Sequence, residues 1–341
     1  MEDKQKKSVT MKDVAQRAGV SVGTVSRVIN QEQGIKKTTL EKVQQAIAEL
    51  DYIPDVYARG MKTNRTETVA LILPTIWHPF FSEFAFFVEE ALSKKNYKLL
   101  LCNTDGAKKE IEYLSMLRQN KVDGIIAITY SPIEDYLASN IPFVSIDRTY
   151  QDKEIACVTS DNQTGGELAA RMLLEKGCQH LAFVGSHNNT VNETKKRRQF
   201  FEETVRLTDK ECLIFDLEEP FDNFLEQLEA FLEQHPQIDG IFAINDFTAL
   251  EVMHILVKQG KRVPDDVQII GYDGIRMAKE HEYLVSTIKQ PLEQMAEEAV
   301  SILLSIIDHQ TPSRQSVLPI SYVEGKTTKN FSKTLDRKRY Q

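Results

Sequence analysis

The sequence predicts a small all-α head followed by a larger α/β body built on parallel sheets. Near the N-terminus, two short amphipathic segments within roughly residues 10–30 are joined by a turn that contains a glycine, as in a helix-turn-helix unit. From about residue 66, continuous apolar runs alternate with amphipathic segments, which is typical of parallel strands buried on both faces and connected by helices. The length of 341 residues suggests two or three domains.

Composition is that of a soluble globular protein, with 41% hydrophobic and 27% charged residues. No apolar run is long enough to span a membrane, and residues 1–7 lead into no apolar signal segment, so we expect a cytoplasmic protein without membrane contact. Four cysteines are widely spaced and form no C-x-x-C pair, which favours buried thiols in a reducing compartment: Cys102, Cys157, Cys178 and Cys212.

Charge is unevenly distributed along the chain. Residues 1–65 contain eight Lys and four Arg against eight acidic residues, a net charge of +4, whereas the whole chain carries −8. A basic head on an acidic body suits a head that meets a polyanion, although an excess of this size is modest.

The stretch 21–30 predicts a helix that can lie in a DNA major groove. Val25, Val28 and Ile29 recur at helical spacing and mark a buried face, while Ser21 is a good N-cap. The other face carries small, polar or basic residues: Val22, Gly23, Ser26, Arg27 and Asn30. A helix with such an outer face can approach base edges closely.

A first short helix precedes this stretch. Thr10 and Asp13 have the spacing of a capping box, and Val14, Ala15 and Ala18 line one side of the following turns. Gly19 supplies the tight turn, so the two segments together predict a helix-turn-helix. Periodicity alone fits a generic pair of packed helices equally well.

A third amphipathic helix follows. The sequence 38–41 reads as a capping box, and Leu40, Val43, Ile47 and Leu50 give the apolar face. After Pro54, the segment 55–62 is about two turns long and too short to be a stable helix alone. It is either a plain linker or a hinge that becomes helical only when paired with its twin on DNA.

Seven apolar runs in the body predict strands: 68–74, 98–102, 124–128, 143–147, 181–184, 240–244 and 267–271. Polar residues gather at the ends of three of these runs: Asp147 with Arg148, Asn245 with Asp246, and Asp273. Ligands of open parallel sheets bind beyond the carboxyl ends of the strands. Because loops begin wherever strands end, polar residues in these positions fit an ordinary loop equally well.

Several motifs resemble the LacI/GalR family of transcriptional regulators over nearly all of residues 8–326. The motifs are 9–15, 18–21, 24–30, the Tyr52-Ile53-Pro54 run with Ala58-Arg59-Gly60, 142–148, 271–273 and 287–291. The resemblance implies a helix-turn-helix head, a hinge and a body with two lobes like those of periplasmic binding proteins.

In the head, the resemblance implies that Val22, Gly23 and Arg27 read bases while Thr24, Ser26 and Asn30 position the phosphate backbone. It implies that Ala58 and Met61 lie in the minor groove, with Met61 as an apolar wedge. The remaining implied DNA contacts are Thr10, Ser21, Tyr52, Asp55 and Arg59. Three positions depart from the family pattern: Met61 replaces the usual Leu, Asp55 replaces Asn and adds a negative charge beside DNA, and Gly23 leaves more of the base reading to Arg27.

In the body, the resemblance implies a small sugar bound between the lobes. The implied contacts are an aromatic platform, Phe80, and the polar residues Asp147, Arg148, Arg197, Asn245, Asp246, Asp273 and Gln290. Phe200 stands where the family usually has Gly, which changes the packing around Arg197. Carboxylates, amides and an arginine suit a ligand with many hydroxyls. Several stretches are similar to sucrose operon repressors, so the expected effector is sucrose, fructose or a relative.

We therefore expect a homodimeric, cytoplasmic repressor of a carbohydrate operon that binds a palindromic operator and needs no metal or cofactor. The expected parts are a head (1–53), a hinge (54–65), a two-lobed body (66–326) and a polar tail (327–341), which lacks leucine heptads for tetramer formation.

Three alternatives remain. A sugar-binding transport protein shares the body fold but has no use for the head. A regulator controlled by a co-repressor fits the same sequence. A glycosidase-like enzyme could pair Asp246 with Asp273 and use His78 or His187 as a base, but no G-x-S-x-G elbow or Cys/His metal spacing accompanies them.

Overall fold

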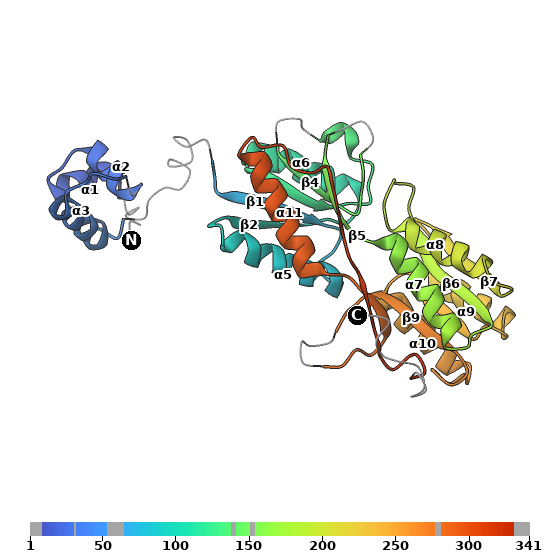
Figure 1. Cartoon of the computed structure of the whole chain (residues 1–341). Helices are drawn as coiled ribbons and strands as arrows, with labels where there is room; N and C mark the ends of the chain where they lie inside the picture. The colour runs from blue at the N-terminus through green and yellow to red at the C-terminus, as the bar shows by residue number, and fades with distance from the viewer. Residues whose placement is uncertain are drawn as a thin grey trace, which may run out of the picture. The chain divides into compact units, whose positions relative to one another are not determined.

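The computed structural model describes residues 9–30, 32–52, 65–137, 141–150, 154–276 and 281–330. The chain forms two compact units, Met1–Glu67 and Thr68–Gln341, which we call the head and the body (Figure 1).

Three helices lie within the described residues of the head: α1 (Met11–Ala18), α2 (Val22–Ile29) and α3 (Lys37–Glu49). At the start of α1, the Asp13 carboxylate accepts hydrogen bonds from the Thr10 amide (2.8 Å) and hydroxyl (2.6 Å), which is the predicted capping box. Gly19 ends the helix in the left-handed conformation (φ 66°), which glycine adopts without strain. The three helices enclose one small core: Val14, Ala15, Val25, Val28, Val43, Ala46 and Tyr52.

The predicted capping box at 38–41 is wrong. Helix α3 begins at Lys37 after Lys36, and no side chain caps it. The amides of Thr39 and Leu40 already donate to the Lys36 carbonyl, so Thr38 lies inside the first turn and cannot be its cap.

In the part of the body that the structure describes, the strands form two six-stranded sheets. The first sheet has the order β11-β5-β4-β3-β1-β2, and every pair in it is parallel. Its strands are β1 (Thr68–Leu73), β2 (Lys98–Asn103), β3 (Gly124–Ile128), β4 (Phe143–Ile146), β5 (Ala156–Ser160) and β11 (Gln315–Leu318). Helices α5 (Pro79–Ser93) and α11 (Leu292–Ile307) cover one face, and α6 (Ala107–Gln119) covers the other. We call this layered unit the first lobe.

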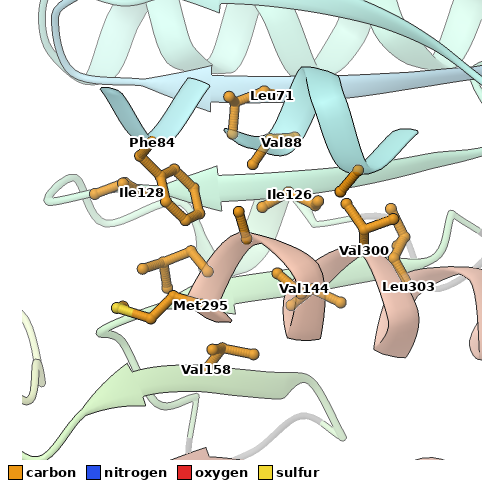
Figure 2. Close-up of a cluster of buried hydrophobic side chains, with 14 of the residues drawn as sticks. Leu71, Phe84, Val88, Ile126, Ile128, Val144, Val158, Met295, Val300 and Leu303 are labelled. Carbon is orange, nitrogen blue, oxygen red and sulfur yellow. The ribbon is translucent and has the colours of Figure 1, made fainter. Parts of the chain in front are cut away.

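Alternation along the strands explains why both faces of the first sheet are apolar. Leu71, Ile126 and Val144 point toward α5 and α11, where they meet Phe84 and Leu303 (Figure 2). Their strand neighbours, such as Ile72 and Ile125, point to the opposite face against α6. Successive side chains of a strand point to opposite faces, so continuous apolar runs bury both.

The second lobe is built in the same way on the sheet β12-β10-β9-β8-β6-β7. Its strands are β6 (His180–His187), β7 (Glu211–Glu218), β8 (Gly240–Ala243), β9 (Gln268–Asp273), β10 (Ser286–Lys289) and the antiparallel β12 (Ser321–Val323). Helices α7 (Asn162–Glu175) and α8 (Lys195–Arg206) pack on one face, and α9 (Phe224–Gln234) and α10 (Asp246–Lys258) on the other.

The chain crosses between the lobes three times: from β5 to α7, from β10 to α11 and from β11 to β12. After β12, Thr327 and Thr328 are buried in the second lobe. The Thr327 hydroxyl donates to the Ile269 carbonyl (2.7 Å), and the Ser286 amide donates to that hydroxyl (2.9 Å). The body therefore continues beyond the predicted boundary at residue 326, because these hydroxyls join β9 to β10.

The predicted fold class is confirmed, and all seven predicted strands are present with ends shifted by up to three residues. Sequence analysis missed five strands: β5, β7, β10, β11 and β12. Across the residues that the structure describes, no helix is both long and apolar enough to cross a membrane.

Candidate functional sites

Helix α2 presents a small exposed surface in the head. Ser21, Val22, Gly23 and Arg27 are exposed, and Val22 keeps 44% of its surface accessible. A Cβ added to Gly23 would meet only the Ser21 hydroxyl, at 3.8 Å, so the backbone here is open to close approach. The half-buried residues beside this surface are engaged in hydrogen bonds. Thr24 bonds to the N-cap residue Ser21, and Asn30 bonds to Ser26.

The other predicted DNA contacts lie in different surroundings. Thr10 is exposed but is engaged in the capping box of α1. Tyr52 belongs to the core of the head and is only 8% exposed, so it lies apart from the exposed residues of α2. Asp55, Ala58, Arg59 and Met61 fall outside the described residues.

At the first lobe's side of the interlobe junction, Asp147 follows β4. It is 3% exposed and adopts a left-handed backbone (φ 57°), which is uncommon for a residue with a side chain. The Thr159 hydroxyl donates to its carboxylate at 2.5 Å, and its carbonyl accepts the Glu193 amide of the second lobe at 2.8 Å. Burial raises the pKa of Asp147, and the positive charge of Arg197 opposes that rise.

At the second lobe's side, Arg197 of α8 faces Asp273 at the end of β9. The Arg197 Nη1 lies 3.7 Å from the Asp273 Oδ1 and donates to the Ile244 carbonyl at 3.0 Å. The guanidinium stacks 3.6 Å from the Tyr272 ring centroid. Gln290, at the second crossover, donates to the Asp273 carboxylate at 2.8 Å.

Burial raises the pKa of Asp273 to about 7, while Arg197 and the Gln290 amide pull it down. Like Asp147, Asp273 has a positive φ (110°). Both carboxylates are therefore held at strand ends by backbone conformations that side chains rarely adopt, a form of strain found at functional sites.

Four of the predicted effector residues come together here, and we call them, with Thr159 and Asn162, the interlobe cluster: Asp147, Thr159, Asn162, Arg197, Asp273 and Gln290. All six are at most 6% exposed. They combine carboxylates, amides, a hydroxyl and a guanidinium, which can serve a ligand carrying several hydroxyl groups.

The structure does not bring Arg148 into this cluster. Its guanidinium is buried inside the first lobe, where it donates to the Thr129 hydroxyl (2.8 Å) and the Ser131 carbonyl (2.5 Å) and pairs with Glu134 (2.5 Å). It also stacks on Tyr150. The structure therefore places the Arg148 side chain inside the first lobe, and its contact with the effector stays a prediction.

Three other predicted effector residues perform local tasks. Asn245 caps α10 by accepting the Thr248 amide at 2.8 Å. Asp246 accepts the amides of Gly274 (2.9 Å) and Ile275 (2.7 Å), so it fixes the turn after Asp273. Phe80 is 5% exposed and belongs to the core of the first lobe, with its ring edge-on to Phe81. Of the three, Asp246 acts beside the interlobe cluster, because the turn that it holds directly follows Asp273.

Sequence reasoning gave no site role to Thr159, Asn162, Tyr130 or Tyr272, although Tyr272 lies in the matched motif 271–273. Asn162 follows β5, a strand that was not predicted, so the polar residues at its end carried no signal. Tyr130 is the second residue after β3, and its phenol experiences the charges of Asp147, Arg197 and Asp273. All four lie within two residues of the end of a strand: Thr159 and Asn162 at β5, Tyr130 at β3 and Tyr272 at β9.

Comparisons with known proteins identify the family. Residues 66–326 match the periplasmic binding proteins and sugar binding domain of the LacI family, and residues 10–55 match the bacterial regulatory proteins of the lacI family. The chain belongs to the LacI family of bacterial regulatory proteins.

Two curated LacI-family relatives align over almost the whole chain. A ribose operon repressor of Halalkalibacterium halodurans is 37% identical over 323 residues, covering 94% of this chain and 97% of the relative. A sucrose operon repressor of Streptococcus mutans is 35% identical over 318 residues, covering 92% and 98%.

Solved structures of the LacI family share the fold. A regulator from Alkaliphilus metalliredigens complexed with D-xylulofuranose has a TM-score of 0.70 and 32% identity, covering 77% of this chain and all of that one. A lac repressor dimer bound to operator and an anti-inducer has a TM-score of 0.81 at 23% identity, covering 94% and 99%.

The predicted family is thus confirmed, and so is the prediction that the protein is not an enzyme, because the LacI family consists of transcriptional regulators. The glycosidase-like alternative is set aside on this ground. In the structure, moreover, Asp246 is occupied with the backbone amides of the turn at Gly274.

Proposed function

We propose that this protein is a cytoplasmic, homodimeric repressor of a carbohydrate operon, released from a palindromic operator by a small sugar bound at the interlobe cluster. The observation that carries the proposal is the burial of two carboxylates and one guanidinium together between two lobes, in a chain of the LacI family. Such groups are costly to bury unless a partner completes their hydrogen bonds.

The proposed parts are a DNA-reading head (1–53), a hinge (54–65) and an effector-binding body (66–326 with the buried residues that follow). In the head, Val22, Gly23 and Arg27 would contact bases, and Ser21, Thr24, Ser26 and Asn30 would meet phosphates. The exposed small surface of α2 supports these roles, since it allows close approach to a groove.

In the body, Asp147, Arg197, Asp273 and Gln290 would bind the sugar. The Gln290 Oε1 is buried and accepts no hydrogen bond from the residues that the structure describes, so it is available to a sugar hydroxyl. Asn245 and Asp246 would act indirectly, through the start of α10 and the turn after Asp273. Phe80 would act from the core of the first lobe.

The proposed effector is a sugar that presents a five-membered ring, such as ribose, fructose or the fructosyl part of sucrose. The support is chemical: ribose, sucrose and xylulofuranose, named in the relatives and in the solved complex, can all offer such a ring. A single site with a fixed set of hydrogen-bond donors and acceptors recognises one shared ring with neighbouring hydroxyls more readily than three unrelated ligands.

Sugar binding would favour one arrangement of the lobes and thereby weaken operator binding. This is a coupling free energy between two sites, so the operator must weaken sugar binding by the same factor.

The test is fluorescence anisotropy with a labelled palindromic fragment from the gene's own neighbourhood at fixed physiological salt, titrated with ribose, fructose and sucrose. Release by one sugar, with sugar affinity reduced equally by operator, supports the proposal. Operator binding that a sugar strengthens would instead make that sugar a co-repressor. No specific binding to any palindrome would overturn the proposal.

A further inference from the structure

A directed chain of hydrogen bonds joins the two lobes through the interlobe cluster. The Arg197 Nε donates to the Asn162 Oδ1 (2.6 Å), the Asn162 Nδ2 donates to the Thr159 Oγ1 (3.1 Å), and the Thr159 hydroxyl donates to the Asp147 Oδ1 (2.5 Å). Exposure falls between 0% and 5% for all four residues. This chain of hydrogen bonds is therefore shielded from solvent and connects a cation in the second lobe to a carboxylate in the first.

The two middle residues sit on either side of a crossover. Thr159 lies in β5 of the first lobe, and Asn162 is the first residue of α7 in the second lobe. Only Ser160 and Asp161 separate them, so a movement of one lobe against the other must act on this contact. Because the donors all point the same way, each bond polarises the next.

The orientation of the Asn162 amide is fixed from both sides. Its Nδ2 donates to the Ser160 carbonyl (2.9 Å) as well as to Thr159, while its oxygen accepts the Arg197 Nε–H. The reverse orientation would place two donors against each other at Arg197 and leave both first-lobe acceptors unmatched. Asn162 thus presents an acceptor to one lobe and a donor to the other, which a carboxylate cannot do.

We propose that Thr159 and Asn162 are positioning residues that couple the sugar-binding carboxylate of Asp147 to the sugar-binding guanidinium of Arg197, without touching the sugar themselves. This inference rests on the proposed function of the interlobe cluster. In this proposal, the crossover from β5 to α7 transmits the effect of bound sugar from one lobe to the other.

The pKa of Asp147 depends on this chain of hydrogen bonds. Its carboxylate faces Arg197, Glu193, Tyr272 and Asp273 from the second lobe and Tyr130 and Cys157 from the first. Burial raises the pKa of Asp147, and the hydrogen bond from Thr159 lowers it. Loss of the Thr159 hydroxyl should therefore raise this pKa further, whereas a residue that served only to fill space would leave it unchanged.

The matched pair Thr159→Val and Thr159→Ser tests the first step. Valine keeps the shape and removes the donor, and serine restores the donor. For the full-length protein we expect Thr159→Val to weaken sugar binding about tenfold or more, the usual effect of losing a hydrogen bond to a charged group, with sugar-free operator affinity unchanged. Thr159→Ser should bind sugar within about threefold of the original protein. Equal sugar affinity in all three proteins would overturn the proposal.

Asn162→Asp tests the second step, because it keeps an acceptor for Arg197 and loses the donor for Thr159. We expect sugar affinity to fall and the factor by which sugar reduces operator affinity to shrink toward one. A variant that retains the full factor would show that the lobes communicate without this contact.

A measurement without sugar separates the proposal from the proposed function. Carboxyl ¹³C titration of labelled aspartate should show a higher pKa for Asp147 in Thr159→Val and its return in Thr159→Ser. An unchanged Asp147 titration in Thr159→Val overturns the proposal even if sugar binding is as proposed. Failure of the original protein to bind any sugar, with the titration shift present, would overturn the proposed function and leave the hydrogen-bond chain in place.

Discussion

Gly166 of α7 and Arg197 of α8 approach so closely that a Cβ at position 166 would lie 2.3 Å from the Arg197 carbonyl oxygen. Beside it, a Cβ at Gly165 would lie 2.7 Å from the Tyr272 ring. The missing side chains therefore allow α8 to set the Arg197 guanidinium over Tyr272 and toward Asp273. The distance is well inside van der Waals contact with backbone, so any other residue must push the two helices apart.

We predict that Gly166→Ala destabilises the body by about 1–3 kcal/mol, as overpacking does, despite the gain of about 1 kcal/mol that alanine usually gives in a helix. Because the shift moves Arg197, sugar affinity should fall as well. Urea unfolding of the full chain, with and without sugar, measures both effects. The control is Gly23→Ala, where the new Cβ finds open space and head stability should rise by about 0.5–1 kcal/mol. A gain of stability at position 166 as well would contradict this account of the packing.

The raised pKa of Asp273 predicts a pH dependence of stability. In the folded body the pKa is about 7, whereas an unfolded aspartate titrates near its ordinary value of about 4. The folded state therefore holds a proton that the unfolded state has lost, so the contribution of Asp273 is fully present below pH 4 and is lost as the pH rises through 7. We expect the Tm of the sugar-free protein to fall between pH 5 and pH 8.

Asp273→Asn isolates this contribution from those of Asp147 and Asp246, whose pKa values are also raised by burial. Asparagine tolerates the positive φ and keeps the shape. Between pH 5 and pH 8, the Tm of the variant should fall less than that of the original protein, and the difference measures the contribution of Asp273. Parallel Tm curves for the two proteins from pH 5 to pH 8 would show that Asp273 is already ionised in the folded state.

The sequence predicted the layers and the strand ends better than the side-chain partners. Continuous apolar runs identified strands such as β1, β3 and β8, in which nearly every residue is apolar and buried. They missed β5, which ends in Thr159 and Ser160, and β7, whose short apolar run is flanked by charges. Asp147 and Asp273 were found because each ends a predicted strand. The local tasks of Arg148 and Asp246 could not be foreseen, since Ser131, Glu134 and the amides at 274–275 approach them only through tertiary structure.

Arg27 is exposed on α2, and its removal leaves the core of the head intact. We predict that Arg27→Ala lowers affinity for the cognate operator by about 1–3 kcal/mol, the range for a bidentate contact to a base, and leaves sugar binding unchanged. Competition anisotropy with cognate and scrambled duplexes measures the loss of specificity. The control is Arg17→Ala, an exposed arginine that pairs with Glu49 on the head, which should retain discrimination between the two duplexes. Equal losses for both duplexes in Arg27→Ala would make it a phosphate contact instead.

Arg148 provides the sharpest contrast between resemblance and structure, because its guanidinium is 2% exposed and bonded within the first lobe. We predict that Arg148→Met destabilises the body by about 1–3 kcal/mol, as when a buried acceptor such as the Thr129 hydroxyl loses a charged hydrogen-bond donor. The loss follows because Glu110, buried beside the guanidinium, is left without a positive charge to oppose its burial, which already raises its pKa. Arg314→Met, which removes an exposed pair with Glu154, should change stability by less than about 1 kcal/mol. Urea unfolding at pH 7 compares the two variants, and calorimetry at low temperature measures sugar binding by the folded fraction. Arg148→Met with normal stability and no sugar binding would restore this residue to the effector site and show that its guanidinium turns toward the ligand.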